Sequence, residues 1–482
     1  MSTEAALLRA IRDCPDDDTP RLVYADLVEE DGDAARGEFI RVQVALARTP
    51  ETDPARNALE DREHELLAEN EARWLGVPPE TDGLLFWRFA RGFVEEVSAT
   101  PSFMLNEGSD LCAANPVRRW RVGSSQGDMA EDLIEAGRRG WFARLEALDL
   151  SGWFQAIGEM ERFLTRSDFE RLRELDLSDC GGLDDLGVVL ERSALREQLR
   201  VLRAGASYGV GTALDAAHLS RALAPTRLVE LSVPGCFLSA DDVRRLLASD
   251  CCRELSSLNI RDNHIEPNAW DAFQAAECRL RSLDLSGTPL GAISLDDVLR
   301  QESLSELRVL HLNRCGSAMA NMHALASSRF WTQAEVLQMQ DGTIPERSLE
   351  PLFRSAGSPN LRVLDVGGNY FREDGVRGLC GAKWAGSLTT LNLSRNYLTN
   401  EAARLIAGCE RFTQLRSLDL SYNNRHDQPD ADPGDQITDA GLWAIIESPH
   451  LTNLRHLDVT GLQFTGETRA ALQRRFGRGL RG

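Results

Sequence analysis

Lysine is almost absent from this sequence of 482 residues. Lys383 is the only lysine among the 54 Lys and Arg residues. A Walker A phosphate-binding loop requires a lysine behind a glycine-rich turn. Lys383 lies in no such turn, so nucleotide hydrolysis of that kind is excluded. A catalytic or Schiff-base lysine would have to be this one residue, which we interpret instead as an exposed lysine at a helix end.

Signals for a membrane span and for disulfide bonds are also lacking. No apolar run approaches the roughly 20 residues needed to cross a bilayer. The N-terminus, MSTEAALLRA, does not resemble a secretion signal. The ten cysteines show no C-x-x-C spacing, so we expect reduced thiols and a cytoplasmic location. The adjacent Cys251 and Cys252 are interpreted as ordinary thiols.

Positive charge is in the minority. The formal net charge is −21, and residues 1–75 carry 19 Asp and Glu against 9 Arg. Binding to a phosphate backbone or to an anionic membrane surface is favoured by clustered cations. We therefore expect neither nucleic acid nor membrane as a partner. The arginine-rich tail, TRAALQRRFGRGLRG, is interpreted as a solvated capping helix.

One motif recurs through most of the chain. Its copies have the form LRSLDLSGT, with leucine at position four of every copy and Leu, Ile, Val or Met at position six of all but the third copy. The spacing is mostly 27 residues, and the first residues of the copies are 145, 172, 199, 228, 255, 280, 307, 334, 361, 388, 415 and 454. Segments with helical periodicity, such as LTNEAARLIAG, lie between the copies.

The pattern L-x-x-L-x-L-x-x-N/C is the signature of leucine-rich repeats. With repeats long enough to hold a helix, the chain resembles the ribonuclease-inhibitor-like class over residues 117–482. A degenerate thirteenth unit lies at VRRWRV, and a capping strand at FVEEVSA. The resemblance implies an α/β solenoid (horseshoe) with a parallel concave sheet and convex helices. Asn or Cys at position nine, such as Asn396 or Cys180, is expected to satisfy backbone groups between successive turns.

The stretch GASYG, residues 205–209, matches the G-x-S-x-G nucleophile elbow of serine hydrolases. It occupies positions seven to eleven of the third copy, and Ser207 stands at position nine, where other copies have Asn or Cys. Strand, turn and helix are the context of every repeat, so this context does not favour a hydrolase. We interpret Ser207 as a turn residue and expect no catalytic residue.

Residues 1–75 predict a small all-α module of four helices. The second is expected to have Thr19 as N-cap, Pro20 in its first turn and Gly32 at its end. The runs D-T-P-R-L-V-Y-A-D, E-E-D-G-D and A-R-G-E-F-I-R, between Asp18 and Arg41, resemble the bacterial repeat-companion domain, with Leu27 where tryptophan is expected. The resemblance implies a bacterial protein and supplies no chemistry. We divide the chain into this module (1–75), a connector and N-terminal cap (76–116), and an array of about 13 units with a C-terminal capping helix (117–482).

Two acidic clusters raise the question of a metal site. Asp16, Asp17 and Asp18 are interpreted as a solvated turn at a helix N-terminus, where the helix dipole favours acids. A 12-residue insertion near residues 424–436 contributes Asp427, Asp430, Asp432 and Asp435, whose spacing fits no EF-hand loop. We interpret it as a polar surface loop. No metal and no cofactor is therefore expected.

In a leucine-rich repeat array, positions three, five and seven of each strand point into the concave face. These positions carry eight acids and four arginines, with the arginines concentrated toward the N-terminal end. Asp at position five is common in the L-x-x-L-D-L-S form of the repeat, so it says little about a ligand. Six residues in the middle of the arch are the best candidates for binding a partner: Arg203, Asn259, Arg261, Asp284, His311 and Gln338. As exposed positions they should tolerate substitution, so that Asp284→Arg should leave folding intact.

Two functions remain open. The favoured one is a non-enzymatic protein–protein interaction scaffold or sensor that binds a protein partner in the concave face. The alternative is a regulatory subunit or substrate of a multi-protein enzyme system, such as a protease, with the acidic N-terminal module as docking or release element. His311 between Asp284 and Gln338 is the nearest approach to an acid–base group, and it has no nucleophile beside it.

Overall fold

The computed structural model describes all residues except 1–2, 51–52, 54, 124–129, 155–156, 166–168, 207–211, 266–269, 289–297, 317–321 and 425–435. The chain forms two compact units. Unit 1 comprises Met1–Ser207 and His218–Arg227, and unit 2 comprises Tyr208–Ala217 and Leu228–Gly482.

Four helices precede the first strand of unit 1, as predicted: α1 (Thr3–Asp13), α2 (Thr19–Glu30), α3 (Ala34–Arg48) and α4 (Ala55–Leu75). Helix α2 ends as expected, because Gly32 adopts a left-handed φ of 100° just beyond the C-cap. The predicted start is wrong, since the N-cap is Asp18 and not Thr19. The Asp17 carboxylate accepts a hydrogen bond from the Thr19 N–H at 2.8 Å, and Thr19 is already helical.

The remainder of unit 1 alternates strands with helices. Its sheet starts with an antiparallel hairpin of β1 (Leu84–Ala90) and β2 (Phe93–Ala99), and it is parallel from β2 onward. The following elements are α5 (Pro101–Asn106), α6 (Gly108–Ala114), β3 (Arg119–Val122), α7 (Ala130–Arg138), β4 (Ala147–Asp149), α8 (Ile157–Leu164), β5 (Glu174–Asp176), α9 (Leu186–Glu191), β6 (Val201–Arg203) and α10 (Ala216–Ala222). The capping strand expected at FVEEVSA is β2, and the degenerate unit VRRWRV supplies β3.

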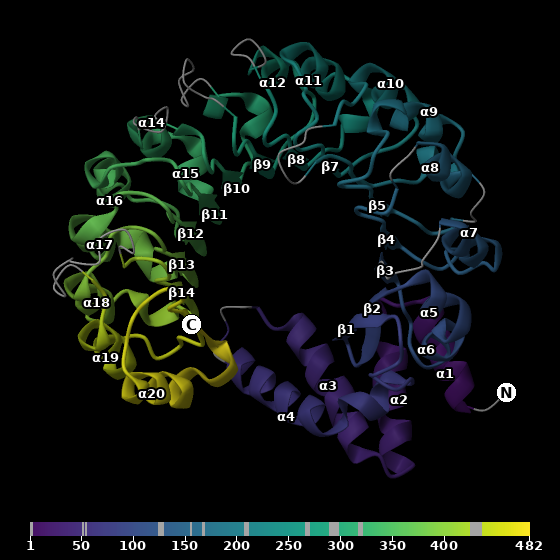
Figure 1. Cartoon of the computed structure of the whole chain (residues 1–482), viewed down its shortest axis with the longest axis horizontal. Coiled ribbons are helices and arrows are strands. Elements are labelled where there is room, and N and C mark those ends of the chain that lie inside the picture. Colours follow the sequence, from purple (N-terminus) through teal and green to yellow (C-terminus); the bar gives the residue numbers. More distant parts are fainter. Residues whose placement is uncertain are drawn as a thin grey trace. The chain divides into compact units, whose positions relative to one another are not determined.

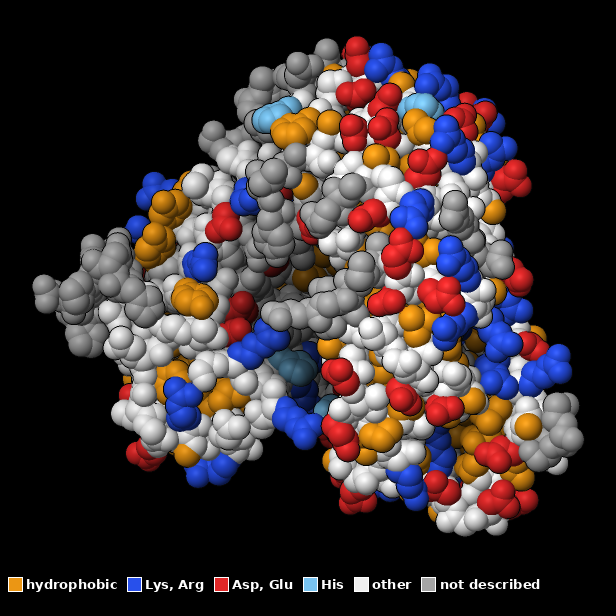
Figure 2. Space-filling view, turned by 45° about the vertical axis from the view of Figure 1, so that its right-hand side comes forward, with side chains coloured by type: hydrophobic (Ala, Val, Ile, Leu, Met, Phe, Trp, Pro, Cys, Tyr) orange, Lys and Arg blue, Asp and Glu red, His pale blue; other side chains and the backbone are white. Residues whose placement is uncertain are grey.

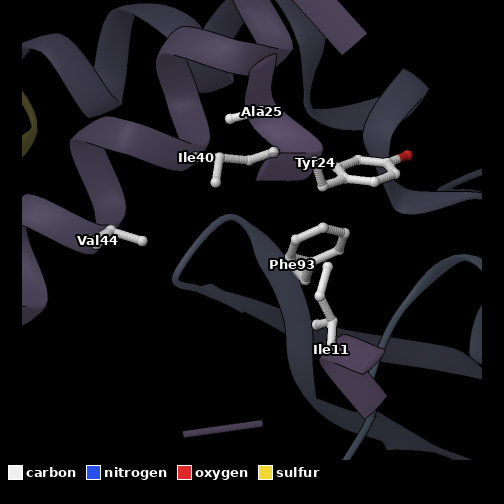
Figure 3. Close-up of a cluster of buried hydrophobic side chains, with 6 residues drawn as sticks. All are labelled: Ile11, Tyr24, Ala25, Ile40, Val44 and Phe93. Carbon is white, nitrogen blue, oxygen red and sulfur yellow. The ribbon is translucent and has the colours of Figure 1, made fainter. Parts of the chain in front are cut away.

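Helices α1, α2 and α3 share one hydrophobic core with β2 (Figure 3). Its buried members are Ile11, Tyr24, Ala25, Ile40, Val44 and Phe93. The boundary expected at residue 75 separates helices from strands, and this core includes residues from both sides of it. The division of the chain at residues 75 and 116 stays a prediction.

A buried ion pair joins α2 to β2. Arg21 is fully buried, and its Nη2 lies 2.6 Å from Oε1 of Glu95. The same guanidinium donates a hydrogen bond to the Pro15 carbonyl oxygen at 2.9 Å. Removing one member of a buried pair leaves the other charge uncompensated, which costs about 3–5 kcal/mol. Arg21 belongs to the run D-T-P-R-L-V-Y-A-D, so this residue of the motif fixes the helices to the first strands.

Unit 2 continues the alternation, with its strands on the inner side of an arc and its helices on the outer side (Figure 1). Its strands are β7 (Glu230–Ser232), β8 (Ser257–Asn259), β9 (Ser282–Asp284), β10 (Val309–His311), β11 (Val336–Gln338), β12 (Val363–Asp365), β13 (Thr390–Asn392), β14 (Ser417–Asp419), β15 (His456–Asp458) and β16 (Leu480–Arg481). Its helices are α11 (Ala240–Leu247), α12 (Trp270–Ala275), α14 (Met322–Ser327), α15 (Arg329–Gln333), α16 (Glu350–Arg354), α17 (Arg372–Gly381), α18 (Asn400–Ala407), α19 (Asp439–Glu447) and α20 (Gly466–Phe476). The expected C-terminal capping helix is α20, and β16 follows it to pair with β15, which the sequence analysis did not predict.

The leucines at position four form the inner layer of unit 2. Leu283, Leu310, Leu337 and Leu364 are paired in register on adjacent parallel strands, and none is more than 3% exposed. The expected inward direction of position four is confirmed here. A side chain of one copy therefore packs mainly on those of its neighbours, as in other solenoids.

The side chain at position nine hydrogen-bonds to backbone groups of its own copy and of the preceding copy. Asn396 is fully buried, and its Nδ2 donates to the carbonyl oxygens of Val366 at 2.8 Å and Ser394 at 3.0 Å. Its Oδ1 accepts from the Phe371 N–H at 3.1 Å. In unit 1 the Cys180 thiol makes a single comparable bond, to the Leu150 carbonyl oxygen at 3.2 Å. The predicted backbone role of Asn and Cys is thus confirmed for these residues.

Candidate functional site: the strand face and its tyrosine rim

The side chains at positions three, five and seven, here called the strand face, differ between the two units. In unit 1 the arginines are held by neighbouring acids. Arg119 makes two hydrogen bonds of 2.8 Å to the Glu174 carboxylate, and Arg121 Nε lies 2.6 Å from Asp149 Oδ2. With Arg203 they line a hollow of about 260 Å³. The predicted arginine-rich N-terminal end exists, but its charge is largely neutralised within the protein.

Four of the predicted binding residues lie side by side in unit 2. Asn259, Asp284, His311 and Gln338 end the strands β8, β9, β10 and β11 and are paired in register. Arg261 follows β8, with its Nε 3.5 Å from Asp262 Oδ2. The sixth residue, Arg203, ends β6 in unit 1. The structure thus places five of the six in unit 2, and their role in binding stays a prediction.

An acid or amide at position five has a local structural task. Its Oδ1 accepts a hydrogen bond of 2.8–3.1 Å from the N–H at position seven, closing an Asx turn at the end of the strand. The residues that make this bond are Asp149, Asp176, Asn259, Asp284, Asp365, Asn392, Asp419 and Asp458. This hydrogen bond is the physical reason why Asp is frequent at position five. It leaves Oδ2 of Asp, or Nδ2 of Asn, for other contacts.

Asp284 is not the exposed, tolerant position that the sequence suggests. Its side chain is only 16% exposed, and its Oδ1 accepts the Ser286 N–H at 2.9 Å. Burial alone would raise the pKa of Asp284, but the neighbouring His311 and the hydrogen bonds from Ser286 outweigh it, so that the pKa lies below its usual value. The expectation that Asp284 is exposed is therefore wrong. We now predict that Asp284→Arg lowers stability, because the substitution removes a turn cap and inserts a long side chain into a mostly buried position.

His311 and Asp284 are the only part of the candidate site that resembles an acid–base pair. His311 Nδ1 lies 3.6 Å from Asp284 Oδ2, and the His311 side chain is 28% exposed. On its other side is Gln338, an amide that cannot exchange a proton at neutral pH. This geometry suits recognition of a polar group better than proton transfer.

A row of exposed tyrosines borders the strand face of unit 2 where β12, β13 and β14 end. We call Tyr370, Tyr397, Tyr422 and Arg395 the tyrosine rim. Tyr370 and Tyr397 stack with ring centroids 5.6 Å apart, and the Arg395 guanidinium lies 5.0 Å from the centre of the Tyr422 ring. The three tyrosines are 38–45% exposed. Sequence reasoning missed the rim, although aromatic residues at positions eight and ten of three consecutive copies were a readable signal.

The rim is built on strained backbone. Arg395, Tyr397 and Tyr422 adopt left-handed φ values of 51°, 58° and 53°, a conformation that is uncommon for residues with bulky side chains. The left-handed turn at position eight belongs to the repeat itself: other copies have glycine there, as at Gly287 and Gly368, or a larger residue with φ of 51–60°, as at Asp179, Asp262, Arg314 and Asp341. The strain is therefore a property of the repeat turn, and what distinguishes the rim is its exposed aromatic side chains.

Two segments of the chain, residues 172–190 and 387–407, match a family model described as Leucine Rich repeat. They contain β5 and β13, and every copy with described strands repeats their parallel register and leucine layer. The fold is a leucine-rich repeat solenoid.

This leucine-rich repeat solenoid is distantly similar to one curated protein in sequence and to two solved structures in fold. NLR family CARD domain-containing protein 4 of Xenopus tropicalis is 23% identical over 235 residues, 46% of this chain and 21% of that protein. An internalin of Listeria monocytogenes str. 4b F2365 is 16% identical with a TM-score of 0.40, covering 77% of this chain and 91% of the internalin. A chain of the Rad7 and Elc1 complex in yeast is 15% identical with a TM-score of 0.40, covering 97% and 96%. The chain spans about a fifth of the curated relative, and these similarities carry no argument about function.

The structure also bears on the acidic clusters, on metal ligands and on a membrane span. Among Asp16, Asp17 and Asp18, only the first two are solvated, because Asp18 is 12% exposed and its Oδ2 lies 2.7 Å from Arg48. No group of three or more potential metal ligands occurs among the described residues. In the same part of the chain no helix has both the length and the apolar character of a membrane span. Ser207 and the acids of the insertion, Asp427, Asp430, Asp432 and Asp435, lie outside the described residues.

Proposed function

We propose that this leucine-rich repeat solenoid is a non-enzymatic protein–protein interaction scaffold or sensor that binds its partner with the strand face of unit 2 and the tyrosine rim. The observation that carries the proposal is the row of three exposed tyrosines with Arg395 beside a polar strand face. Tyr and Arg are the residue types that dominate binding energy at protein interfaces. Because the turns hold them on ordered backbone, little conformational entropy is lost on binding.

The six candidate residues of the sequence analysis keep a place in this proposal. Asn259, Asp284, His311 and Gln338 offer a row of polar groups in register. The strand-end turns of Asn259 and Asp284 are already closed by their own side chains. Arg261 and Arg203 supply positive charge on the strand faces of unit 2 and unit 1. We assign no catalytic residue, metal or cofactor to the site, and we propose a cytoplasmic location on the basis of the ten free cysteines.

The test is co-purification of the full chain with its partner, followed by titration of the purified partner. The double variant Tyr370→Ala/Tyr397→Ala should fold normally and bind at least about tenfold more weakly, as expected for hot-spot residues. The matched control is Arg404→Ala, an exposed position on α18 in the copy that carries Tyr397. Equal affinity of the tyrosine variant and the control for the partner would refute the proposed surface.

The alternative function makes the N-terminal module a docking or release element of an enzyme system. Release would require the module to leave β2, which means exposing the shared core around Phe93 and separating Arg21 from Glu95. A fragment that ends at residue 75 would likewise have an exposed core and an unpaired Arg21. Hydrogen exchange of the full chain in the presence of the partner distinguishes the two functions, because only release would deprotect α2 and β2 together.

A further inference from the structure

A basic cavity of about 400 Å³ lies in unit 1, away from its strand face. It is bordered by α1, α6, the segment between α7 and β4, and the segment before β5. Five arginines line it, against a single carboxylate, that of Glu146. On the right-hand side of Figure 2, Lys and Arg side chains are interspersed with Asp and Glu side chains, so the excess of arginine is confined to the cavity lining. The net charge of the protein is −21, so an excess of arginine over carboxylate in this cavity is unexpected.

The five arginines differ in how far their charge is compensated. Arg118 is paired with Asp16, Glu95 and Glu146, and Arg139 with Glu135.

The other three have no carboxylate. Arg12 donates only to neutral acceptors, the carbonyl oxygens of Cys112 and Ala113 at 3.2 and 3.4 Å. Within the described part of the chain, no ion pair or hydrogen bond holds the Arg144 or Arg171 side chain, and both are exposed. The cavity therefore keeps two guanidinium groups that an anion can engage.

Part of the cavity lining is aromatic, with Trp120 and Trp141. Trp141 is half-buried and meets Trp120 edge to face, with ring centroids 6.2 Å apart. Gly108 of α6 lies against the Trp141 ring, and a Cβ at this position would come within 3.1 Å of it. Glycine here lets the ring lie close to the helix. Burial raises the pKa of Cys112 to about 12, against the effect of Arg144 and Arg12, so the thiol in the wall is uncharged at neutral pH.

We propose that this cavity binds a phosphate group attached to an aromatic ring, with Arg144 and Arg171 on the phosphate and Trp141 on the ring. The guanidinium groups of Arg144 and Arg171, which have neither a carboxylate nor a hydrogen bond within the described part of the chain, match the charge of a phosphate monoester. The fork of an arginine binds phosphate oxygens in pairs. A ring that stacks on tryptophan accounts for the apolar part of the cavity. The site is distinct from the strand face, so it adds a second ligand to the proposed scaffold.

Calorimetric titration of the full chain with phenyl phosphate tests this site. The double variant Arg144→Gln/Arg171→Gln should bind at least about tenfold more weakly than wild type, because two charged hydrogen-bond donors are lost. The control is Arg138→Gln/Arg162→Gln, which changes two exposed arginines that do not line the cavity; it should bind like wild type. Absence of binding at millimolar phenyl phosphate, or equal affinity of the cavity variant and wild type, overturns the proposal.

Two further probes define the ligand. Inorganic phosphate should bind more weakly than phenyl phosphate, and equal affinity would overturn the role of Trp141. A phosphotyrosyl pentapeptide identifies the source of the aryl phosphate. Tighter binding than phenyl phosphate would assign the cavity to a phosphorylated protein segment, and equal or weaker binding would assign it to a free small molecule.

Discussion

Asp176 in unit 1 and Asp284 in unit 2 occupy the same position of the repeat and close the same Asx turn, yet their environments differ. Burial raises the pKa of Asp176, and the like charge of Asp149 on the neighbouring strand adds to this effect. At Asp284 the neighbour is His311, and the pKa is lowered despite burial. One motif therefore produces two strand faces. On the strand face of unit 1 the charged side chains pair with one another, whereas the strand face of unit 2 carries polar groups bordered by the tyrosine rim.

The largest expected effect concerns position nine. Asn396→Ala should destabilise the array by about 3 kcal/mol, because it leaves several buried backbone groups without partners. Cys180→Ala, at the same position in unit 1, loses one weak sulfur hydrogen bond and should cost about 1 kcal/mol. Chemical denaturation read by hydrogen exchange in the adjacent repeats measures both. Equal losses of stability in the two variants would mean that Asn396 and Cys180 contribute equally to the array.

A smaller effect is expected at the turn cap of Asp284. Asp284→Arg should lower stability by about 1–2 kcal/mol through loss of a buried acceptor. Asp284→Asn keeps an Oδ1 for the Ser286 N–H and should cost less. Thermal melts of the two variants separate the loss of the turn cap from the loss of the charge. If Asp284→Asn were as unstable as Asp284→Arg, the Asx turn would contribute nothing to stability.

The opposite pKa shifts predict opposite pH dependence. The lowered pKa of Asp284 means that its ionised form stabilises the fold above the usual value of 3.8, and that this contribution is lost as pH falls through the folded pKa. Asp284→Asn should therefore be most destabilising above pH 4. The raised pKa of Asp176 means that wild type loses stability as pH rises from 3.8 through the folded pKa. Asp176→Asn should gain relative to wild type over that range, and parallel pH profiles of the two variants would contradict the comparison.

The smallest effect is expected from the exposed ion pair of unit 1. The Arg121 side chain is 66% exposed, so its coupling to Asp149 should be below about 1 kcal/mol. A double-mutant cycle with Arg121→Gln and Asp149→Asn in low and high salt measures it. The coupling should shrink in high salt, and a larger, salt-independent value would mean that the strand face of unit 1 is far more rigid than its exposure indicates.

The repetitive part of the fold was predictable because its determinants are local. Leucine at position four and Asn at position nine repeat at fixed spacing, so one copy predicts the register of the others. The Asx turn of Asp284 was readable in principle, since Asp two residues before Ser is a turn pattern, but burial of that side chain depends on the next strand. The pairs Arg21–Glu95 and Arg118–Asp16 connect residues 74 and 102 positions apart. No period links them, so neither the shared core nor the basic cavity could be predicted from the sequence.

The buried pair of Arg21 and Glu95 also affects how the chain is made. Arg21 leaves the ribosome 74 residues before its partner. At about 5–20 residues per second this interval lasts about 4–15 s. During that time α2 cannot bury the Arg21 guanidinium without the cost of an unpaired charge, so we expect the helices to pack together only after the β1–β2 hairpin has been made. We therefore expect synthesis of the β1–β2 hairpin to set the time at which the N-terminus becomes protected from proteases and from premature association.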